Sequence, residues 1–156
     1  MLKFLKKHAD MDIYSPVKGK CIDISEVEDV GFSSKIMGDG IAVIPEENLI
    51  KAPADGKLTM LFERGHAFGI SADNGADILV HIGIDTVNLN GMGFTSLKKA
   101  GDKVKKGEPI IRIELGKLEK EYDMSTMVIV TNGKKFQKPA LYAEVDENTP
   151  VLEGIE

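Results

Sequence analysis

The 156-residue sequence lacks several features that mark particular classes of protein. It contains one cysteine, Cys21, so no disulfide can form within the chain, which fits a reducing cytoplasm. Cys21 begins a strand-like apolar run with no histidine nearby, and we interpret it as a small buried hydrophobic residue rather than a nucleophile. No run of about 18 apolar residues is present, so no transmembrane helix is expected.

Concentrated positive charge is also missing. The formal net charge is -5, and the lysines and arginines are scattered apart from a few adjacent pairs that suit a solvated surface. Binding to nucleic acid usually requires a basic patch, so a nucleic-acid partner is not expected. At the same time, 42% of the residues are hydrophobic, too many for a disordered chain. The length suits one globular domain with a single core.

The N-terminus has neither the long apolar stretch nor the cleavage site of a secretory signal. Leu2, Phe4 and Leu5 alternate with lysines, a pattern typical of a short basic amphipathic turn at an anionic membrane. The alternative is a frayed terminus. We therefore expect a flexible tail over residues 1–13 and a single domain over residues 14–156, in a cytoplasmic protein that touches the membrane at most peripherally.

The hydrophobic spacing is mostly that of β-strands. Short apolar runs lie at Cys21–Ile24, Ile41–Ile44, Leu58–Phe62, Ile78–Ile82, Ile110–Ile113, Met127–Val130 and Leu141–Ala143. Turn residues separate these runs, and the chain has 16 glycines, several of them in Asn-Gly and Asp-Gly pairs that favour tight hairpins. The expected helical segments are short, at Ser25–Asp29, Ser96–Ala100 and Lys117–Met124. The pattern predicts an all-β fold, a sandwich or a barrel joined by tight hairpins.

A weak internal repeat supports this fold. Ser15–Lys20 and Ala52–Lys57 both read small-Pro-x-x-Gly-Lys, with proline setting an extended entry and glycine a turn. Two matched hairpin starts indicate a pseudo-symmetric sandwich. The later segment Ala100–Pro109 resembles the turn of lipoyl and biotinyl carriers, which have a barrel-sandwich fold.

Histidine is the most informative residue type. Strand alternation places Ile78, Val80 and Ile82 on the core face of one run, so His81 points the other way, and Gly83 is expected to leave space above it. His66 follows a glycine, which suggests a bulge or a close approach of another backbone. The alternation of side chains along a strand therefore does not settle which way the His66 ring points. His8 lies in the predicted tail and is given no role. These residues leave a metal pair, a general base and a nucleophilic imidazole open.

Several longer segments occur in a distinctive order: Gly38–Ala42, Ala52–Gly56, His66–Phe68, Val80–Val87, Gly91–Phe94 and Gly101–Gly107. In this order they resemble the glucose-type enzyme IIA of the bacterial phosphoenolpyruvate-dependent sugar phosphotransferase system, over about residues 14–150. The resemblance implies a compact antiparallel β-sandwich with a shallow apolar depression that holds both histidines. We expect a monomer that needs no cofactor or metal. It implies that His81 accepts a phosphoryl group from the phosphocarrier protein HPr and donates it to a cysteine of a sugar-specific IIB domain. His66 is then the neighbour that stabilises the phosphoryl group.

The resemblance also implies a docking surface. Asp29 and Asp85 match acidic positions that flank the family's site and meet an arginine of the donor. An apolar collar is expected from four further residues, Phe32, Ile36, Phe62 and Leu79. The alternative for these residues is packing in the core, above all for Phe62. Two positions depart from the family pattern: Arg64 stands where a threonine hydroxyl commonly supports the imidazole, and Leu79 stands where an aromatic residue is frequent.

Three other functions compete with this one. A zinc peptidase normally needs three protein ligands, and Asp85 would have to join the two histidines. A swinging-arm carrier would need a modified lysine at a hairpin tip such as Ala100–Pro109. A protein that only regulates partners through its phosphorylation state is compatible with phosphoryl carriage.

Overall fold

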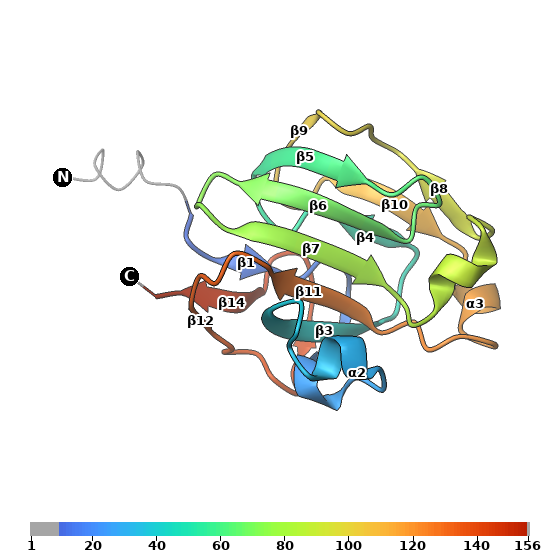
Figure 1. Ribbon diagram of the computed structural model, residues 1–156, viewed down its shortest axis with the longest axis horizontal. Helices are drawn as coiled ribbons and strands as arrows, with labels where there is room; N and C mark the ends of the chain where they lie inside the picture. The colour runs from blue at the N-terminus through green and yellow to red at the C-terminus, as the bar shows by residue number, and fades with distance from the viewer. Residues whose placement is uncertain (1–9, 156) are drawn as a thin grey trace.

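The computed structural model describes residues 10–155 (Figure 1). The strands, in chain order, are β1 (Ile13–Tyr14), β2 (Gly19–Asp23), β3 (Asp39–Pro45), β4 (Leu49–Lys51), β5 (Gly56–Leu61), β6 (Ala67–Ala72), β7 (Asp77–Ile82), β8 (Phe94–Ser96), β9 (Lys103–Val104), β10 (Pro109–Ile113), β11 (Thr126–Val130), β12 (Phe136–Gln137), β13 (Glu144–Val145) and β14 (Pro150–Gly154). The helical segments are η1 (Ile24–Glu26), α2 (Val30–Ser33), η2 (Thr86–Leu89) and α3 (Leu115–Leu118).

The strands form three sheets, and every strand pair is antiparallel. The largest sheet has eight strands in the order β13-β2-β3-β11-β7-β6-β5-β9, and two three-stranded sheets have the orders β4-β10-β8 and β1-β14-β12. In Figure 1 the smaller sheets lie behind and beside the large one, as layers of a sandwich. The predicted all-β antiparallel sandwich is confirmed.

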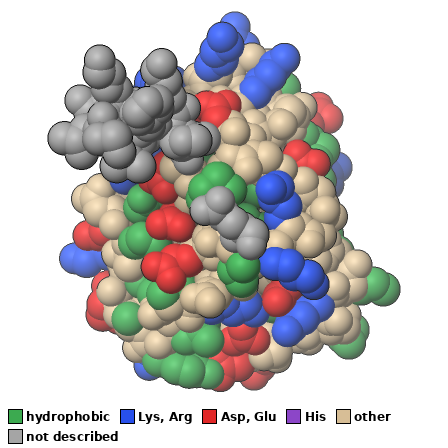
Figure 2. Space-filling model, turned by 90° about the vertical axis from the view of Figure 1, so that its left-hand side faces the viewer, with side chains coloured by type: hydrophobic (Ala, Val, Ile, Leu, Met, Phe, Trp, Pro, Cys, Tyr) green, Lys and Arg blue, Asp and Glu red, His purple; other side chains and the backbone are tan. Residues whose placement is uncertain are grey.

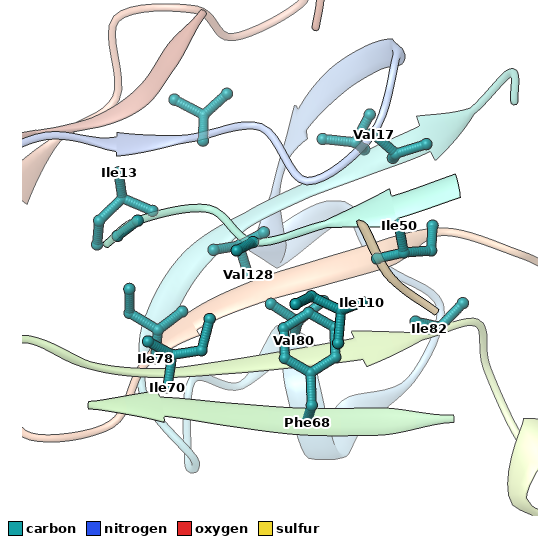
Figure 3. Packing of buried hydrophobic residues seen from close by; sticks show 14 of the residues in the cluster. Ile13, Val17, Ile50, Phe68, Ile70, Ile78, Val80, Ile82, Ile110 and Val128 are labelled. Carbon is teal, nitrogen blue, oxygen red and sulfur yellow. The ribbon is translucent and has the colours of Figure 1, made fainter. Parts of the chain in front are cut away.

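The main core lies between these layers. Ile78, Val80 and Ile82 of β7 point into it together with Phe68 and Ile70 of β6, as Figure 3 shows. Leu79 instead belongs to a second cluster, on the other face of the large sheet. The alternation predicted for this run is therefore the one observed, because a strand directs successive side chains to opposite faces.

The two small-Pro-x-x-Gly-Lys segments lie side by side. The N–H of Lys51 donates to the Pro16 carbonyl at 2.7 Å, and the N–H of Tyr14 donates to the Pro53 carbonyl at 2.8 Å. In each segment the glycine starts a strand where a Cβ would strike a neighbouring strand. At Gly19 it would lie 1.9 Å from the Ile44 carbonyl oxygen, and at Gly56 it would lie 2.4 Å from the Ser71 carbonyl oxygen. Glycine thus allows these two strands to approach their neighbours closely.

Three predicted elements differ from the structure. Leu141–Ala143 is a turn rather than a strand, because Tyr142 adopts φ of 68° and cannot continue an extended backbone. Ser96–Ala100 is not helical, since the N–H of Leu97 donates to the Ile110 carbonyl and keeps this chain beside β10. The helix expected over Lys117–Met124 is α3, which ends at Leu118.

The N-terminal prediction is partly wrong. Ile13, expected at the end of a flexible tail, is fully buried and pairs with Leu152 in β1 and β14. The N–H of Gly154 donates to Asp12 Oδ1 at 3.2 Å, so the chain before β1 is also tied to β14. The expected amphipathic turn and His8 lie outside the described residues. Within residues 10–155, no helix has the length and apolar character needed to span a membrane.

Candidate functional site

A second apolar cluster covers the face of the large sheet that points away from the main core. Its fully or nearly buried members come from η1 and the residue that follows it, from α2, and from the strands β3, β6, β7 and β11. They are Ile24, Val27, Phe32, Ala42, Ala67, Leu79, Met127 and Ile129. Asp29 starts α2 by accepting a hydrogen bond at Oδ1 from the N–H of Gly31 at 2.8 Å. This cap ends the loop after η1 and turns Phe32 onto the sheet.

His81 stands on this face at the centre of the sheet. Its strand, β7, lies between β6 and β11, where His81 is opposite Ala67 and Met127. The ring is half-buried, and its Nδ1 lies 2.9 Å from the Gly83 carbonyl oxygen. A carbonyl can only accept a hydrogen bond, so Nδ1 carries the proton of the neutral ring. The lone pair is then on Nε2, which makes Nε2 the nucleophilic atom.

Gly83 acts differently from the sequence-based expectation. The space above it is filled, because a Cβ there would lie 2.5 Å from Thr86 Cγ2 and 3.1 Å from Met124 Sδ. Gly83 adopts φ of 81°, a left-handed conformation that ends β7 and turns its carbonyl back toward His81. Thr86 secures the same turn by donating from Oγ1 to the Ile82 carbonyl at 2.5 Å.

Replacing Gly83 with alanine tests this role. We expect Gly83→Ala to lower the free energy of unfolding by about 2–5 kcal/mol, because it adds left-handed strain and overpacking. Gly101→Ala is the matched control: Gly101 also has positive φ, 98°, but nothing lies within 4 Å of its Cβ position. The control should lose only about 1–2 kcal/mol. The free energies of unfolding are measured in urea. Equal losses in the Gly83 and Gly101 variants would show that the packing around Gly83 is not tight.

His66 lies immediately before β6, after a tight turn. The N–H of Gly65 donates to the Phe62 carbonyl at 2.8 Å, and Gly65 adopts φ of 77°. This turn brings the His66 ring onto the His81 side of the sheet, although Phe68, two residues later, points into the main core. The two imidazole centroids are 5.4 Å apart, with an angle of 77° between the ring planes. The structure therefore brings together the two histidines that the sequence singled out.

The electrostatic environment keeps both rings neutral. Burial lowers the pKa of His66, and the nearby Arg64 cation lowers it further. Burial also lowers the pKa of His81, as does His66, against opposing effects of the Gly83 carbonyl, Asp29 and Asp85. A pKa below the usual value of about 6.5 leaves a neutral imidazole at physiological pH. Neutral rings suit nucleophilic attack by Nε2 of His81.

These shifts predict a specific pH response. The imidazole C–H resonances of His66 and His81 should both titrate with midpoints below 6.5, the ordinary histidine pKa. In Arg64→Gln the His66 midpoint should rise, because removing a cation stabilises the protonated ring. NMR titration of the wild type and the variant measures both midpoints. An unchanged His66 midpoint would mean that Arg64 does not act on this ring.

Aromatic and apolar side chains surround the pair. The Phe32 ring lies 4.8 Å from the His81 ring, and the Phe62 ring lies 5.2 Å from the His66 ring, both measured between centroids. Phe62 is 36% exposed and Ile36 is 81% exposed, whereas Phe32 and Leu79 are buried. Of the expected collar, Phe62 and Ile36 therefore offer free apolar surface. Phe32 packs beside the His81 ring, and Leu79 lies within the buried cluster of this face.

The two predicted acidic residues differ in their surroundings. Asp29 is half-buried and already engaged as the cap of α2. Asp85 is exposed, and its side chain makes no capping hydrogen bond with η2. Asp85 also adopts φ of 60°, in the turn that follows β7. Both carboxylates lie close enough to act electrostatically on His81.

The structure also bears on the competing functions. Within residues 10–155, no three His, Cys, Asp or Glu side chains come together as a metal site would require. In the turn that resembles a swinging-arm carrier, Lys106 Nζ bonds the Glu147 carbonyl oxygen and Asn148 Oδ1, each at 3.3 Å. The same ammonium group lies 4.3 Å from the centre of the Tyr14 ring. Lys106 is therefore held against the domain.

Comparison with known proteins decides the family. The model of the EIIA 1 family of the phosphoenolpyruvate-dependent sugar phosphotransferase system matches residues 11–136. The chain belongs to this family. As an EIIA protein, it is a phosphocarrier component of a sugar phosphotransferase system. The matched range includes both histidines and all the elements that surround them.

Individual relatives agree. The glucose-specific EIIA component of Borreliella burgdorferi is 46% identical over 133 residues, covering 84% of this chain and 70% of that protein. The β-glucoside-specific EIIBCA component of Bacillus subtilis is 46% identical over 125 residues, which are 80% of this chain but 20% of that protein. The solved glucose permease IIA of Mycoplasma capricolum has a TM-score of 0.83 and 35% identity, and the match covers 90% of this chain and 93% of that one.

Two features of this EIIA site were missed from the sequence. The Gly83 carbonyl sets the tautomer of His81, and no sequence signal could show this because the acceptor is a backbone atom. The helix α2, which carries Phe32, was also not predicted. Asp29 followed by Gly31 was an available N-cap signal, but four residues are too few to give a helical period.

Proposed function

We propose that Nε2 of His81 accepts a phosphoryl group from phosphorylated HPr and then donates it to a cysteine of a sugar-specific IIB domain. The observation that carries this proposal is the 2.9 Å contact between His81 Nδ1 and the Gly83 carbonyl oxygen. It directs the lone pair to Nε2 on a ring that is neutral and half-buried. Relatives at 46% identity include a glucose-specific and a β-glucoside-specific component, so the proposed final acceptor is a glucose-type sugar or a glucoside.

Both steps are phosphoryl transfers that need no other reactant. In the first, the Nε2 lone pair of His81 forms a bond to phosphorus while the phosphorus–nitrogen bond of the donor histidine breaks, and its electron pair stays on the donor ring. In the second, a cysteine thiolate attacks phosphorus and His81 recovers its lone pair. Each transition state is loose and in-line, with negative charge spread over three oxygens. The protein therefore has to orient the ring and supply hydrogen-bond donors.

His66 is placed to supply one of these donors. Its Nδ1 is buried without a hydrogen-bond partner in the described chain, so only Nε2 can reach a phosphoryl oxygen, and the proposal places the ring proton there. With the ring centroids 5.4 Å apart, a group on Nε2 of His81 is within reach of His66. Where the family commonly has a supporting hydroxyl, Arg64 donates from Nη1 toward the Val87 carbonyl at 3.5 Å and contributes positive charge beside His66.

The surface around the pair fits a basic partner with an apolar centre. Phe62, whose ring lies 5.2 Å from that of His66, provides exposed apolar area, and Asp29 and Asp85 provide negative charge near His81. Rim charges of this kind mainly raise the rate of association.

Neutralising the two aspartates tests the docking surface. In Asp29→Asn/Asp85→Asn, labelling by limiting phosphorylated HPr should slow about tenfold at low salt and less at high salt. Asparagine at position 29 preserves the cap of α2, so the helix should remain. Glu144→Gln/Glu153→Gln, on β13 and β14, is a control with the same charge change. Equal slowing in the two double variants would mean that only net charge matters.

The proposed function itself is tested with the wild-type protein. The chain is incubated with phosphoenolpyruvate, the general enzyme I and HPr, and the phosphate is then mapped by peptide mass spectrometry. We expect one acid-labile, base-stable phosphate on the peptide that contains His81. A label on another residue, or no label while HPr is fully phosphorylated, would overturn the proposal.

A further inference from the structure

A pocket of about 310 Å³ lies beside the start of β3, outside the histidine pair. Its walls come from the loop between α2 and β3, the end of β11, the loop from β11 to β12, and β14. In the sheet register its strand residues Gly40 and Val130 lie at one end of β3 and β11, and Ala42 and Met127, beside His81, lie farther along the same strands. The pocket is therefore separate from the phosphoryl site, although both lie along the same strands.

The charge of this pocket is unlike that of the whole chain. Four lysines and one aspartate line it, in a protein whose formal net charge is -5. They are Lys35, Lys134, Lys135, Lys138 and Asp39. Figure 2, drawn from the side where β12 and β14 lie, shows Lys and Arg side chains gathered on the right-hand part of this face. An excess of ammonium groups around a hollow attracts anions.

The lysines differ in how firmly they are held. Lys138 is mostly buried and bonds Asp23 Oδ1 at 2.6 Å and Asp39 Oδ1 at 2.7 Å, so its charge is already matched. Lys35 is 3.5 Å from the same Asp39 oxygen, at a loose, exposed contact. Lys135 forms no ion pair within the described residues. Lys134 also forms no ion pair within the described residues, but the end of its side chain lies against Gly75. Because Lys35 is only loosely held and Lys135 is unpaired in that part of the chain, we take these two lysines as the cations that bind a ligand.

The rest of the wall is apolar, and part of it is held in an unusual conformation. Apolar side chains line the pocket: Ile36, Met37, Val130, Phe136 and Leu152. Ile36 and Met37 are 81% and 41% exposed, so the loop presents apolar surface to solvent. Lys35 adopts φ of 64°, a conformation that non-glycine residues avoid and that often occurs at ligand clamps. Converging cations and an apolar wall in a volume of this size are typical of small-molecule sites.

We propose that this pocket binds a compact organic phosphate, with the phosphate between Lys35 and Lys135 and a small apolar body against Met37 and Phe136. Lysine binds phosphate as a point charge, and more than one lysine suits a dianion. The small volume, about 310 Å³, favours a small molecule over a protein segment. This proposal concerns binding by the unphosphorylated chain, so it stands or falls independently of phosphoryl transfer at His81.

The test is an NMR titration of the ¹⁵N-labelled full chain with phenyl phosphate as the probe and inorganic phosphate as the comparison. We expect saturable shifts for the amides of residues 35–40 and 130–138, and tighter binding of phenyl phosphate than of inorganic phosphate. In Lys35→Gln/Lys135→Gln the affinity should fall about tenfold or more, the equivalent of about 1.4 kcal/mol. A well-dispersed spectrum shows that this variant is folded.

The matched control removes the same charge from another lysine-lined depression. Lys57 and Lys103 pair across β5 and β9 and line a depression with two aspartates, Asp55 and Asp73. Lys57→Gln/Lys103→Gln should bind phenyl phosphate with unchanged affinity. Three results would overturn the proposal: shifts that do not saturate, equal losses of affinity in the two double variants, and inorganic phosphate binding as tightly as phenyl phosphate.

Discussion

His81→Gln is expected to accept no phosphoryl group from phosphorylated HPr, with labelling at the background level after any incubation time. The glutamine amide nitrogen has no available lone pair, because it is delocalised into the carbonyl. The side chain is otherwise of similar length, and the half-buried position tolerates its polarity. Labelling with radioactive phosphoenolpyruvate, enzyme I and HPr, followed by gel separation, measures acceptance directly.

Two controls give this result its meaning. Urea unfolding of His81→Gln should remain cooperative, since the main core residues of β7 are unchanged. His66→Gln, changed at the neighbouring ring, should still become labelled in the same reaction. Labelling of a folded His81→Gln would place the nucleophile elsewhere and refute the assignment of His81.

His66→Gln is expected to separate acceptance from donation. It should accept phosphate, yet pass it to a IIB domain about 10²–10³-fold more slowly. Removing one hydrogen-bond donor that is aimed at developing negative charge typically slows a reaction by this factor. The imidazole is fixed for this task by the turn at Gly65 and by the Phe62 ring, 5.2 Å away. A glutamine amide has no such fixed orientation. The phosphorylated variant should therefore accumulate when IIB is added.

Rapid-quench measurement of label leaving the phosphorylated protein gives the rate of donation. His8→Gln is a control of the same residue type, at a histidine to which the sequence assigns no role. Donation by His66→Gln at the wild-type rate would mean that His66 only packs beside His81. Loss of both acceptance and donation would point instead to a disturbed His81 ring.

The position of His81 was predictable because β7 is regular. Alternation over Ile78, Val80 and Ile82 required that His81 face the other way, and the structure places it there. The same rule does not apply to His66, because that residue precedes β6 and its direction depends on the turn at Gly65. Side chains alternate between the two faces only within a strand. The packing of Phe62 against His66 follows from that turn and could not be predicted for the same reason.

The apolar collar shows a second limit. Sequence pattern distinguishes apolar from polar positions, but it does not give the depth of each side chain. Phe32 and Leu79 belong to the buried cluster, while Ile36 stands out from a loop beside the lysine-lined pocket. The predicted strand at Leu141–Ala143 failed similarly. Its apolar residues suited a strand, but the left-handed Tyr142 makes the chain turn before β13 begins.

The pairing of β1 with β14 has a consequence for how such a unit can be joined to others. Ile13 lies opposite Leu152, so both ends of the described chain leave the fold from one side. In Figure 1 that side is opposite the arrowhead of β7, next to which His81 lies. A connector attached at either end would therefore leave the reactive ring uncovered, and it would have to be long enough to reach around the domain. The length of the connector would set the effective concentration of a tethered acceptor. It would therefore control how often that acceptor meets His81.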